Sequence, residues 1–172
     1  MAISLYDLSV ANFLQTVGAV EGFLAKAATH FKEKGVDPNE VVEARLAADM
    51  LPFGFQIQSV AHHSLGAIHG VQAGQFSPGG LTADTYAGLQ KIVADAHEAL
   101  KKLSPGDVNA LEGKDVTFQF KDFKLPFTAE NFLLSFSLPN FYFHATTAYD
   151  ILRHKGVPLG KRDFTGKLRL KS

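Results

Sequence analysis

The fold is decided by residues 138–156, which read LPNFYFHATTAYDILRHKG. Aromatic and aliphatic residues recur through this stretch at helical spacing and predict a long, mostly buried helix that ends at Gly156. Asn140 and His144 lie four residues apart and therefore project from the same helix face. Because a buried polar side chain is unfavourable without a partner, we expect both to face a pocket.

Three further helices are expected to pack around this one. The periodicity and capping residues predict them over residues 4–35, about 49–70 and about 82–103. Ser4 and Asp7 have the spacing of a capping box, Pro52 fits only in a first helical turn, and Thr82 is the expected cap of the third helix. Asp37 and the proline after it predict a short helical turn between the first two helices.

Before the last helix the pattern changes to strand. Apolar and polar residues alternate from Val116 to Phe120, and Lys124 to Phe127 is expected to pair with them as a hairpin. Thr128 should cap the last helix and Pro139 should kink or break it. The sequence therefore predicts an all-α fold, a four-helix bundle forming a single domain over residues 1–172, with a small β-hairpin before the last helix.

Composition excludes several classes of function. Seventeen acidic and seventeen basic residues cancel, which argues against a nucleic-acid partner or a polybasic contact with a membrane. The absence of cysteine excludes disulfides, thiolate metal sites and cysteine nucleophiles. The sequence starts without the basic and apolar regions of a signal peptide and has no long apolar run, so a cytoplasmic protein with no membrane partner is expected. A homodimer is the expected assembly.

The second helix supplies possible partners for the pocket. Asp49, Gln56 and His63 recur at helical spacing and are expected to flank the same groove as Asn140 and His144. Tyr149 could extend a hydrogen-bond network there. Two interpretations of His144 are open: a metal ligand or proton-transfer group, or a core histidine whose hydrogen bonds are satisfied within the protein.

His62 and His69 are expected to be solvated, because both point away from the groove side of the second helix. Adjacent helical residues do not share a face, so the pair His62 and His63 is not expected to clamp a metal ion.

The last helix resembles that of the DinB/YfiT-like four-helix-bundle superfamily in the positions of His144, Arg153 and Gly156. A closer resemblance covers nearly the whole chain. It is to a branch of that superfamily catalogued as a domain of unknown function, and it rests on RLAADM (45–50), LPNF (138–141), HATTAY (144–149) and LGKRDF (159–164).

The superfamily resemblance implies a divalent metal, often zinc or nickel, held by one histidine of the second helix and two of the last. Some members are thiol-dependent transferases or isomerases. Here Asn140 stands at the first of the paired histidine positions, and an amide oxygen is a weak zinc ligand. The ligand set that the resemblance leaves is His63, His144 and Asn140, with Gln56 as the alternative on the second helix.

Three hypotheses of function follow. The first is a bundle whose metal site has degenerated and whose polar pocket binds a small molecule. The second is a divalent-metal-dependent enzyme, thiol-transferase-like or hydrolytic, that uses His63, His144 and Asn140 with a water molecule. The third is a non-catalytic homodimeric stress or interaction protein, in which the polar core residues only satisfy one another.

Overall fold

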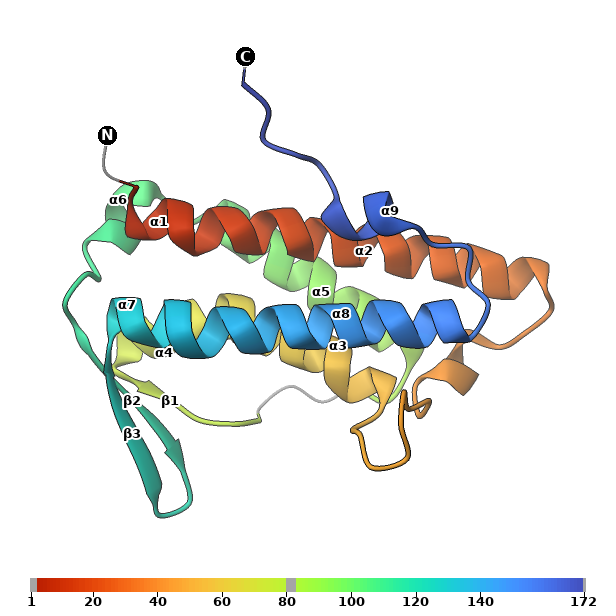
Figure 1. Cartoon of the computed structure of the whole chain (residues 1–172), viewed down its shortest axis with the longest axis horizontal. Helices are drawn as coiled ribbons and strands as arrows, with labels where there is room; N and C mark the ends of the chain where they lie inside the picture. The colour runs from red at the N-terminus through yellow and green to blue at the C-terminus, as the bar shows by residue number, and fades with distance from the viewer. Residues whose placement is uncertain (1–2, 80–82, 172) are drawn as a thin grey trace.

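Helices form most of the computed structural model, which describes residues 3–79 and 83–171 (Figure 1). Four long helical stretches run roughly side by side, and a small sheet lies at one end of them. The helices are α1 (Leu5–Leu8), α2 (Val10–Glu33), α3 (Phe53–Ala61), α4 (Ala67–Ala73), α5 (Tyr86–Lys101), α6 (Pro105–Asn109), α7 (Ala129–Asn131), α8 (Leu138–His154) and α9 (Lys161–Thr165). The predicted helical bundle is therefore confirmed.

The first stretch consists of α1 and α2. The Ser4 hydroxyl accepts from the Asp7 amide at 3.2 Å, and the Asp7 carboxylate accepts from the Ser4 amide, so the predicted capping box is present. Ser9 separates the two helices and donates its hydroxyl to the Leu5 carbonyl at 2.6 Å. Gly35 follows the end of α2 with φ of +68°, a conformation that favours glycine.

The second stretch begins later than predicted. Asp37 caps the 3₁₀ turn η1 (Pro38–Val41), but the next helix starts at Phe53 rather than near Asp49. Pro52 is the N-cap of α3, in extended conformation, and so stands just outside the helix instead of within its first turn. A π-helical segment, η2 (His62–Gly66), connects α3 to α4.

The third stretch is α5. Its predicted cap, Thr82, lies outside the described residues. The Thr85 hydroxyl accepts from the Gly88 amide at 3.1 Å and caps the helix, which begins at Tyr86. Ser104 in turn caps α6, a short helix in a region that the sequence marked only as the end of the third helix.

The predicted hairpin is present as β2 (Asp115–Phe120) and β3 (Phe123–Thr128), with Val116 opposite Phe127. A third strand, β1 (Gln75–Phe76), pairs in parallel with β2 and was not predicted, because two residues carry no alternation. The strand order β1-β2-β3 leaves β3 at the outer edge, where Pro126 pairs with Thr117. The hairpin projects from the end of the bundle (Figure 1).

The fourth stretch is continuous from α7 to α8. Thr128 caps it as predicted, through a 3.4 Å bond from the Asn131 amide. A π-helical segment, η3 (Phe132–Ser137), ends two residues before Pro139, which lies in the first turn of α8. The predicted kink or break is absent, since Figure 1 shows a continuous helix there. Because Pro139 has no amide hydrogen to give to the preceding turn, the wider π turn accommodates it without breaking the helix.

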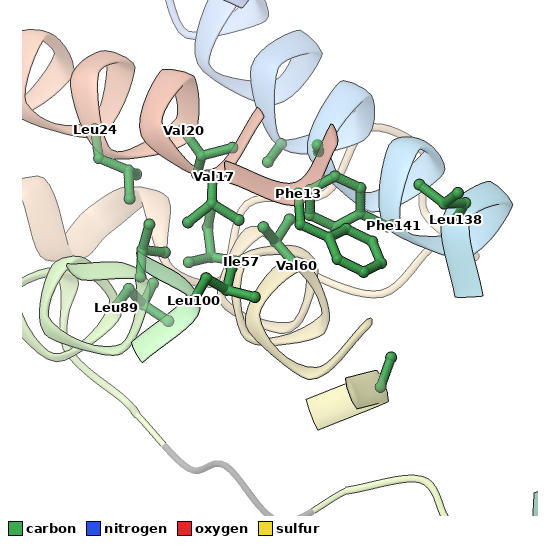
Figure 2. Close-up of a cluster of buried hydrophobic side chains, with 14 of the residues drawn as sticks. Phe13, Val17, Val20, Leu24, Ile57, Val60, Leu89, Leu100, Leu138 and Phe141 are labelled. Atoms are coloured by element: carbon green, nitrogen blue, oxygen red, sulfur yellow. The ribbon is translucent and has the colours of Figure 1, made fainter. Parts of the chain in front are cut away.

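The bundle core lies where α2, α3, α5 and α8 meet (Figure 2). The core residues labelled in the figure are apolar and at most 8% exposed: Phe13, Val17, Val20, Leu24, Ile57, Val60, Leu89, Leu100, Leu138 and Phe141. Phe13 and Phe141 pack edge to face at 5.0 Å between ring centroids and join α2 to α8.

By length and mean hydropathy, the stretch Leu5–Glu33 meets the requirement for a membrane-spanning helix, but a core helix meets it too. The sequence analysis expected no stretch of this length and hydropathy. Half of its most apolar window is buried in the bundle, so this single helix is weak evidence for a membrane span.

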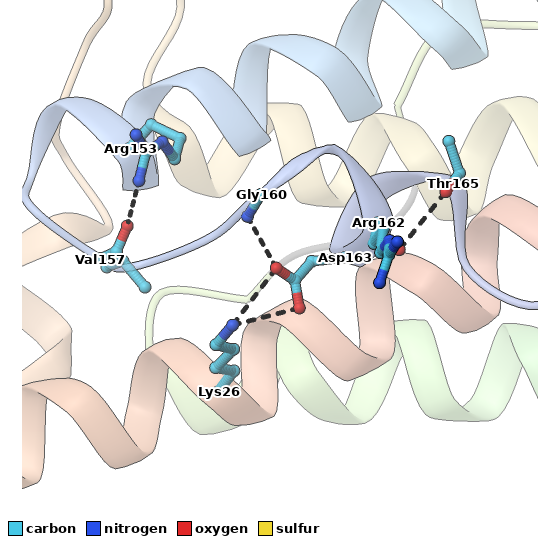
Figure 3. A network of polar contacts seen from close by, with 7 residues as sticks. All are labelled: Lys26, Arg153, Val157, Gly160, Arg162, Asp163 and Thr165. Carbon is cyan, nitrogen blue, oxygen red and sulfur yellow. Dashed lines mark hydrogen bonds and ion pairs between the residues drawn. The ribbon is translucent and has the colours of Figure 1, made fainter.

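The C-terminal segment crosses the outer side of α2 as an ordered strap. Lys26 pairs with Asp163 at 3.2 Å, and the same carboxylate accepts from the Gly160 amide at 2.7 Å (Figure 3). Gln15 donates to the Thr165 carbonyl at 2.9 Å. These contacts hold α9 against α2.

Candidate functional site

A cavity of about 310 Å³ lies between α3, η2, the sheet and the η3–α8 stretch. The described residues that line it are Phe55, Gln58, Ser59, His62, His63, Phe76, Pro78, Gly79, Phe118, Phe136, Asn140 and His144. Three histidines and four phenylalanines among them make a wall that is mostly aromatic. None of these lining residues is Lys, Arg, Asp or Glu.

The sheet contributes two of the aromatic rings. Phe76 of β1 and Phe118 of β2 face Phe136 of η3, with ring centroids 6.3 Å and 4.9 Å from it. Gly70 of α4 makes room for this docking, because a Cβ atom there would lie 2.9 Å from the Phe76 ring. The sequence analysis assigned Phe76 no role.

His144 is held by a hydrogen bond to Gln56. Its Nδ1 lies 2.7 Å from Gln56 Oε1, while Gln56 Nε2 donates to the Leu51 carbonyl at 2.8 Å. The Leu51 carbonyl can only accept, so the amide nitrogen of Gln56 must face it and the amide oxygen must face His144. His144 Nδ1 therefore donates, and its Nε2 keeps a lone pair. Burial lowers the pKa of His144 to about 4, so the ring is neutral near pH 7.

His63 lies beside His144, with the two rings nearly parallel and their centroids 5.7 Å apart. The side chain is only 9% exposed, and its Nδ1 is buried without a hydrogen-bond partner among the described residues. Burial, followed by the nearby His144 and His62, lowers the pKa of His63 to about 3. An unpartnered buried nitrogen is uncommon and points to a group that the protein itself does not supply.

His62 lines the cavity, although the sequence analysis expected it to be solvated. Its Nε2 lies 2.9 Å from the Ser77 carbonyl, and its ring stacks on Phe76 at 4.3 Å. Burial lowers the pKa of His62, and the Ser77 carbonyl partly opposes this shift. The cavity wall on α3 and η2 is a stripe more than one residue wide, running from Phe55 through Ser59, so that both adjacent histidines reach it. His69 is exposed, as expected.

Asn140 lines the cavity one turn before His144. Its Nδ2 donates to the Phe136 carbonyl at 2.7 Å, within its own helix. Its side-chain oxygen remains available as an acceptor.

The two π-helical segments meet next to the cavity. Ser137, fully buried in η3, donates its hydroxyl to the carbonyl of His63 in η2 at 2.8 Å. π turns are rare and occur often at functional sites. This bond joins the two helices that carry His63 and His144.

Two residues assigned to the pocket from sequence lie elsewhere. Asp49 is exposed in the loop before α3, because the helix starts only after Pro52. Tyr149 packs against Phe23 of α2 and Phe164 of α9, with ring centroids at 6.3 Å and 5.8 Å. Five residues after His144, Tyr149 has turned well away from the face of α8 that borders the cavity.

The residues present do not fit the divalent metal that the superfamily resemblance implies. Within residues 3–79 and 83–171, no group of three His, Cys, Asp or Glu side chains is placed to hold a metal ion. His63 and His144 supply two imidazoles, and the third member of the set, Asn140, supplies a neutral amide oxygen. Catalytic zinc sites use three stronger protein ligands. The pocket instead offers neutral hydrogen-bonding groups between aromatic walls.

Comparison with known proteins identifies the fold and leaves the activity open. The family described as "Domain of unknown function (DUF1993)" matches residues 5–165. A crystal structure of a DinB family member protein from Shewanella denitrificans is 27% identical and superimposes with a TM-score of 0.81, over 98% of this chain and 95% of the other. No curated protein matches the sequence.

Proposed function

The chain belongs to the DUF1993 family, a family of DinB-like helical bundles, and within this fold we propose that the cavity beside His63 and His144 binds a small, largely aromatic molecule. The carrying observation is His144: Gln56 fixes its Nδ1 as a donor, which leaves Nε2 for a ligand. The buried, unpartnered Nδ1 of His63 supports the same proposal.

The dimensions of the cavity agree with such a ligand. Its volume of about 310 Å³ is at the lower end of the range for small-molecule sites, about 300–1,000 Å³. Phe55, Phe76, Phe118 and Phe136 provide apolar walls, and a few polar groups converge between them. Apolar walls with a few placed polar groups are typical of ligand pockets.

The test is a titration of the full chain, without a histidine tag, with toluene and phenol. Histidine ring resonances are followed by NMR. Saturable shifts of the His63 and His144 signals are expected, with a dissociation constant on the order of 1 mM or lower. If neither probe gives a saturable shift of these signals, the proposal is wrong.

A cavity-filling variant locates the binding site. Ser59 is 7% exposed and lines the cavity, so Ser59→Phe should fill part of it and weaken binding of both probes by about tenfold or more. Ser135→Phe is the matched control, because Ser135 is exposed on η3 outside the lining. It should leave both affinities unchanged.

Two other hypotheses from the sequence stay predictions. Elemental analysis tests the metalloenzyme, for which about one equivalent of metal per chain is expected and His144→Ala should remove it. Light scattering after size exclusion tests the homodimer. Neither result changes the titration above, which measures ligand binding directly.

A further inference from the structure

Three polar side chains of the cavity, those of His62, Asn140 and His144, already use a hydrogen-bond donor elsewhere in the protein. His144 donates Nδ1–H to Gln56, and His62 donates Nε2–H to the Ser77 carbonyl, which can only accept. Asn140 donates to the Phe136 carbonyl. What His144 keeps for the cavity is therefore an acceptor, the ring nitrogen Nε2, and Asn140 keeps its amide oxygen as an acceptor beside the second hydrogen of its amide nitrogen.

Gln58, the other amide in the lining, is occupied on both sides. Its Nε2 contacts the carbonyls of Gly54 and Ala83 at 3.2 Å and 3.3 Å, and its Oε1 accepts from the Ala83 amide at 3.3 Å. It adds no free donor to the cavity. A ligand that bonds to His144 Nε2 must therefore bring the hydrogen for that bond.

The described part of the wall also lacks charge. No Lys, Arg, Asp or Glu is among the lining residues, and burial keeps His63 and His144 neutral near pH 7. An anion in the cavity would have no cationic partner, and a cation would have no carboxylate. Because burying an unpaired charge is strongly unfavourable, an uncharged ligand is favoured over either ion.

The phenylalanine side chains of the wall favour a ligand that contains an aromatic ring. Phe118 and Phe136 lie 4.9 Å apart, and Phe55 borders His144 at 5.8 Å, so phenyl edges and faces surround the acceptor atoms. An apolar cavity of about 150 Å³ is enough to hold benzene. The volume of about 310 Å³ here leaves space for a ring with small substituents.

We propose that the ligand of this cavity is an uncharged hydroxylated aromatic molecule, a phenol or a dihydroxybenzene, whose hydroxyl groups donate to His144 Nε2 and to the Asn140 oxygen. This inference rests on the proposed function and specifies the chemical class of its ligand. His144 and Asn140 lie one helical turn apart and both line the cavity, so adjacent hydroxyl groups on one ring match two neighbouring acceptors.

The test compares the affinities of five probes for the wild-type chain by calorimetry near pH 7. The probes are phenol, 1,2-dihydroxybenzene, methoxybenzene, benzoate and benzylammonium. Phenol should bind about tenfold more tightly than methoxybenzene, which has similar size and no donor, and 1,2-dihydroxybenzene more tightly still. Benzoate and benzylammonium should bind more weakly than phenol.

The outcomes separate the two proposals. Equal affinity for phenol and methoxybenzene overturns the ligand class and leaves the binding function standing. Tighter binding of benzoate or of benzylammonium than of phenol also overturns the class. No binding by any of the five probes overturns both.

A second variant tests the acceptor role of His144. In Gln56→Glu a carboxylate would face His144 Nδ1, and an adjacent negative charge favours the imidazolium, whose Nε2 is a donor. Phenol should then lose affinity and benzoate should gain about tenfold, while an NMR titration shows a raised pKa of His144. Gln72→Glu, at an exposed position of α4, is the control and should change none of these. An unchanged preference for phenol in a Gln56→Glu chain whose His144 is protonated would overturn the proposal; the wild-type series decides it if this variant does not fold.

Discussion

The two sides of the helix formed by α3 and η2 bury different kinds of side chain. Ile57 and Val60 face the bundle core and are fully buried among apolar neighbours. Gln56 of α3 and His63 of η2, the segment that continues α3, face α8 and are almost as buried but polar. The cavity is bordered by the two π-helical segments η2 and η3. The core side buries apolar side chains, as is usual. The unusual features, buried polar side chains and π turns, lie on the side that we assign to ligand binding.

Buried polar groups show the same contrast. On the core side the Tyr86 hydroxyl donates to the Leu24 carbonyl at 2.8 Å, and burial raises the pKa of Tyr86. On the cavity side His63 Nδ1 has no partner among the described residues. A satisfied tyrosine contributes to stability, whereas an unsatisfied histidine lowers it and is explained more readily by binding. Four predictions test this division.

The largest effect is expected in the core. Phe13→Ala removes a fully buried ring that packs on Phe141, and should lower the free energy of unfolding by about 3–5 kcal/mol. Urea unfolding followed by circular dichroism measures this. Phe143→Ala is the control: Phe143 is 56% exposed on α8, and its loss should change stability by about 0.5 kcal/mol or less. Similar losses for the two variants would contradict the location of the core.

The cavity side should make stability depend on pH. Unfolded imidazoles have a pKa of about 6.5, while His63 and His144 in the folded chain have a pKa of about 3 and about 4. Between these values the unfolded chain binds more protons, so the free energy of unfolding falls as the pH falls below about 6.5. This contribution is complete above that pH and is lost progressively towards the folded pKa values.

The pH effect is isolated by a variant. When the pH falls from about 7 to about 5, the free energy of unfolding of His144→Gln should fall by about 1–2 kcal/mol less than that of the wild type. The reason is that the variant lacks one histidine with a lowered pKa. His154→Gln, at an exposed position of the same helix, should lose as much as the wild type. Parallel pH profiles for wild type and His144→Gln would show that the ring is not buried as described.

A smaller loss is expected where the π segments meet. Ser137→Ala removes the buried donor to the His63 carbonyl and should lower stability by about 1–2 kcal/mol. Ser135→Ala removes an exposed hydroxyl that bonds only within its own helix, and should change stability by about 0.5 kcal/mol or less. Hydrogen exchange should show faster opening around His63 in the first variant alone. Unchanged exchange there would mean that the bond does not hold the two segments together.

The smallest effect is expected on the outer side of α2. Lys26→Gln removes the pair with Asp163, whose partners are 44% and 29% exposed, and should cost about 0–1 kcal/mol, less at high salt. Thermal unfolding at low and high salt measures this. The substitution leaves the bond from the Gly160 amide to Asp163 in place (Figure 3). A loss as large as that of Phe13→Ala would mean that the strap belongs to the core.

Most of the architecture could be predicted from local sequence patterns. Ser4, Asp37 and Thr128 cap their helices as predicted, and Val116 to Phe120 forms the predicted strand, because capping and alternation depend on neighbouring residues. Strand β1 could not be predicted, since Phe76 joins the sheet through pairing with a distant segment. The late start of α3 was missed because the sequence allows Pro52 either within the first helical turn or just before it. In the structure Pro52 stands just before the first turn.

The candidate site was predicted less completely. Gln56, His63, Asn140 and His144 come together as the helical spacing indicated. His62 joins them because the lining stripe is broad, and Phe118 joins them because the sheet packs against η3. Tyr149 was assigned to the pocket because it is close to His144 in sequence and can form a hydrogen bond. In the structure its ring packs against Phe23 of α2 instead.

The outer strand of the hairpin bears on solubility. The segment from Phe118 to Phe127 is rich in phenylalanine, and an exposed strand of this kind is a template for pairing with other chains. Pro126 has no amide hydrogen to extend such pairing, and Lys121 in the turn and Lys124 in β3 bring charge to the hairpin. Natural sheets use proline and lysine on their edge strands against edge-to-edge aggregation. Replacing Pro126 should therefore promote aggregation of the protein through this strand.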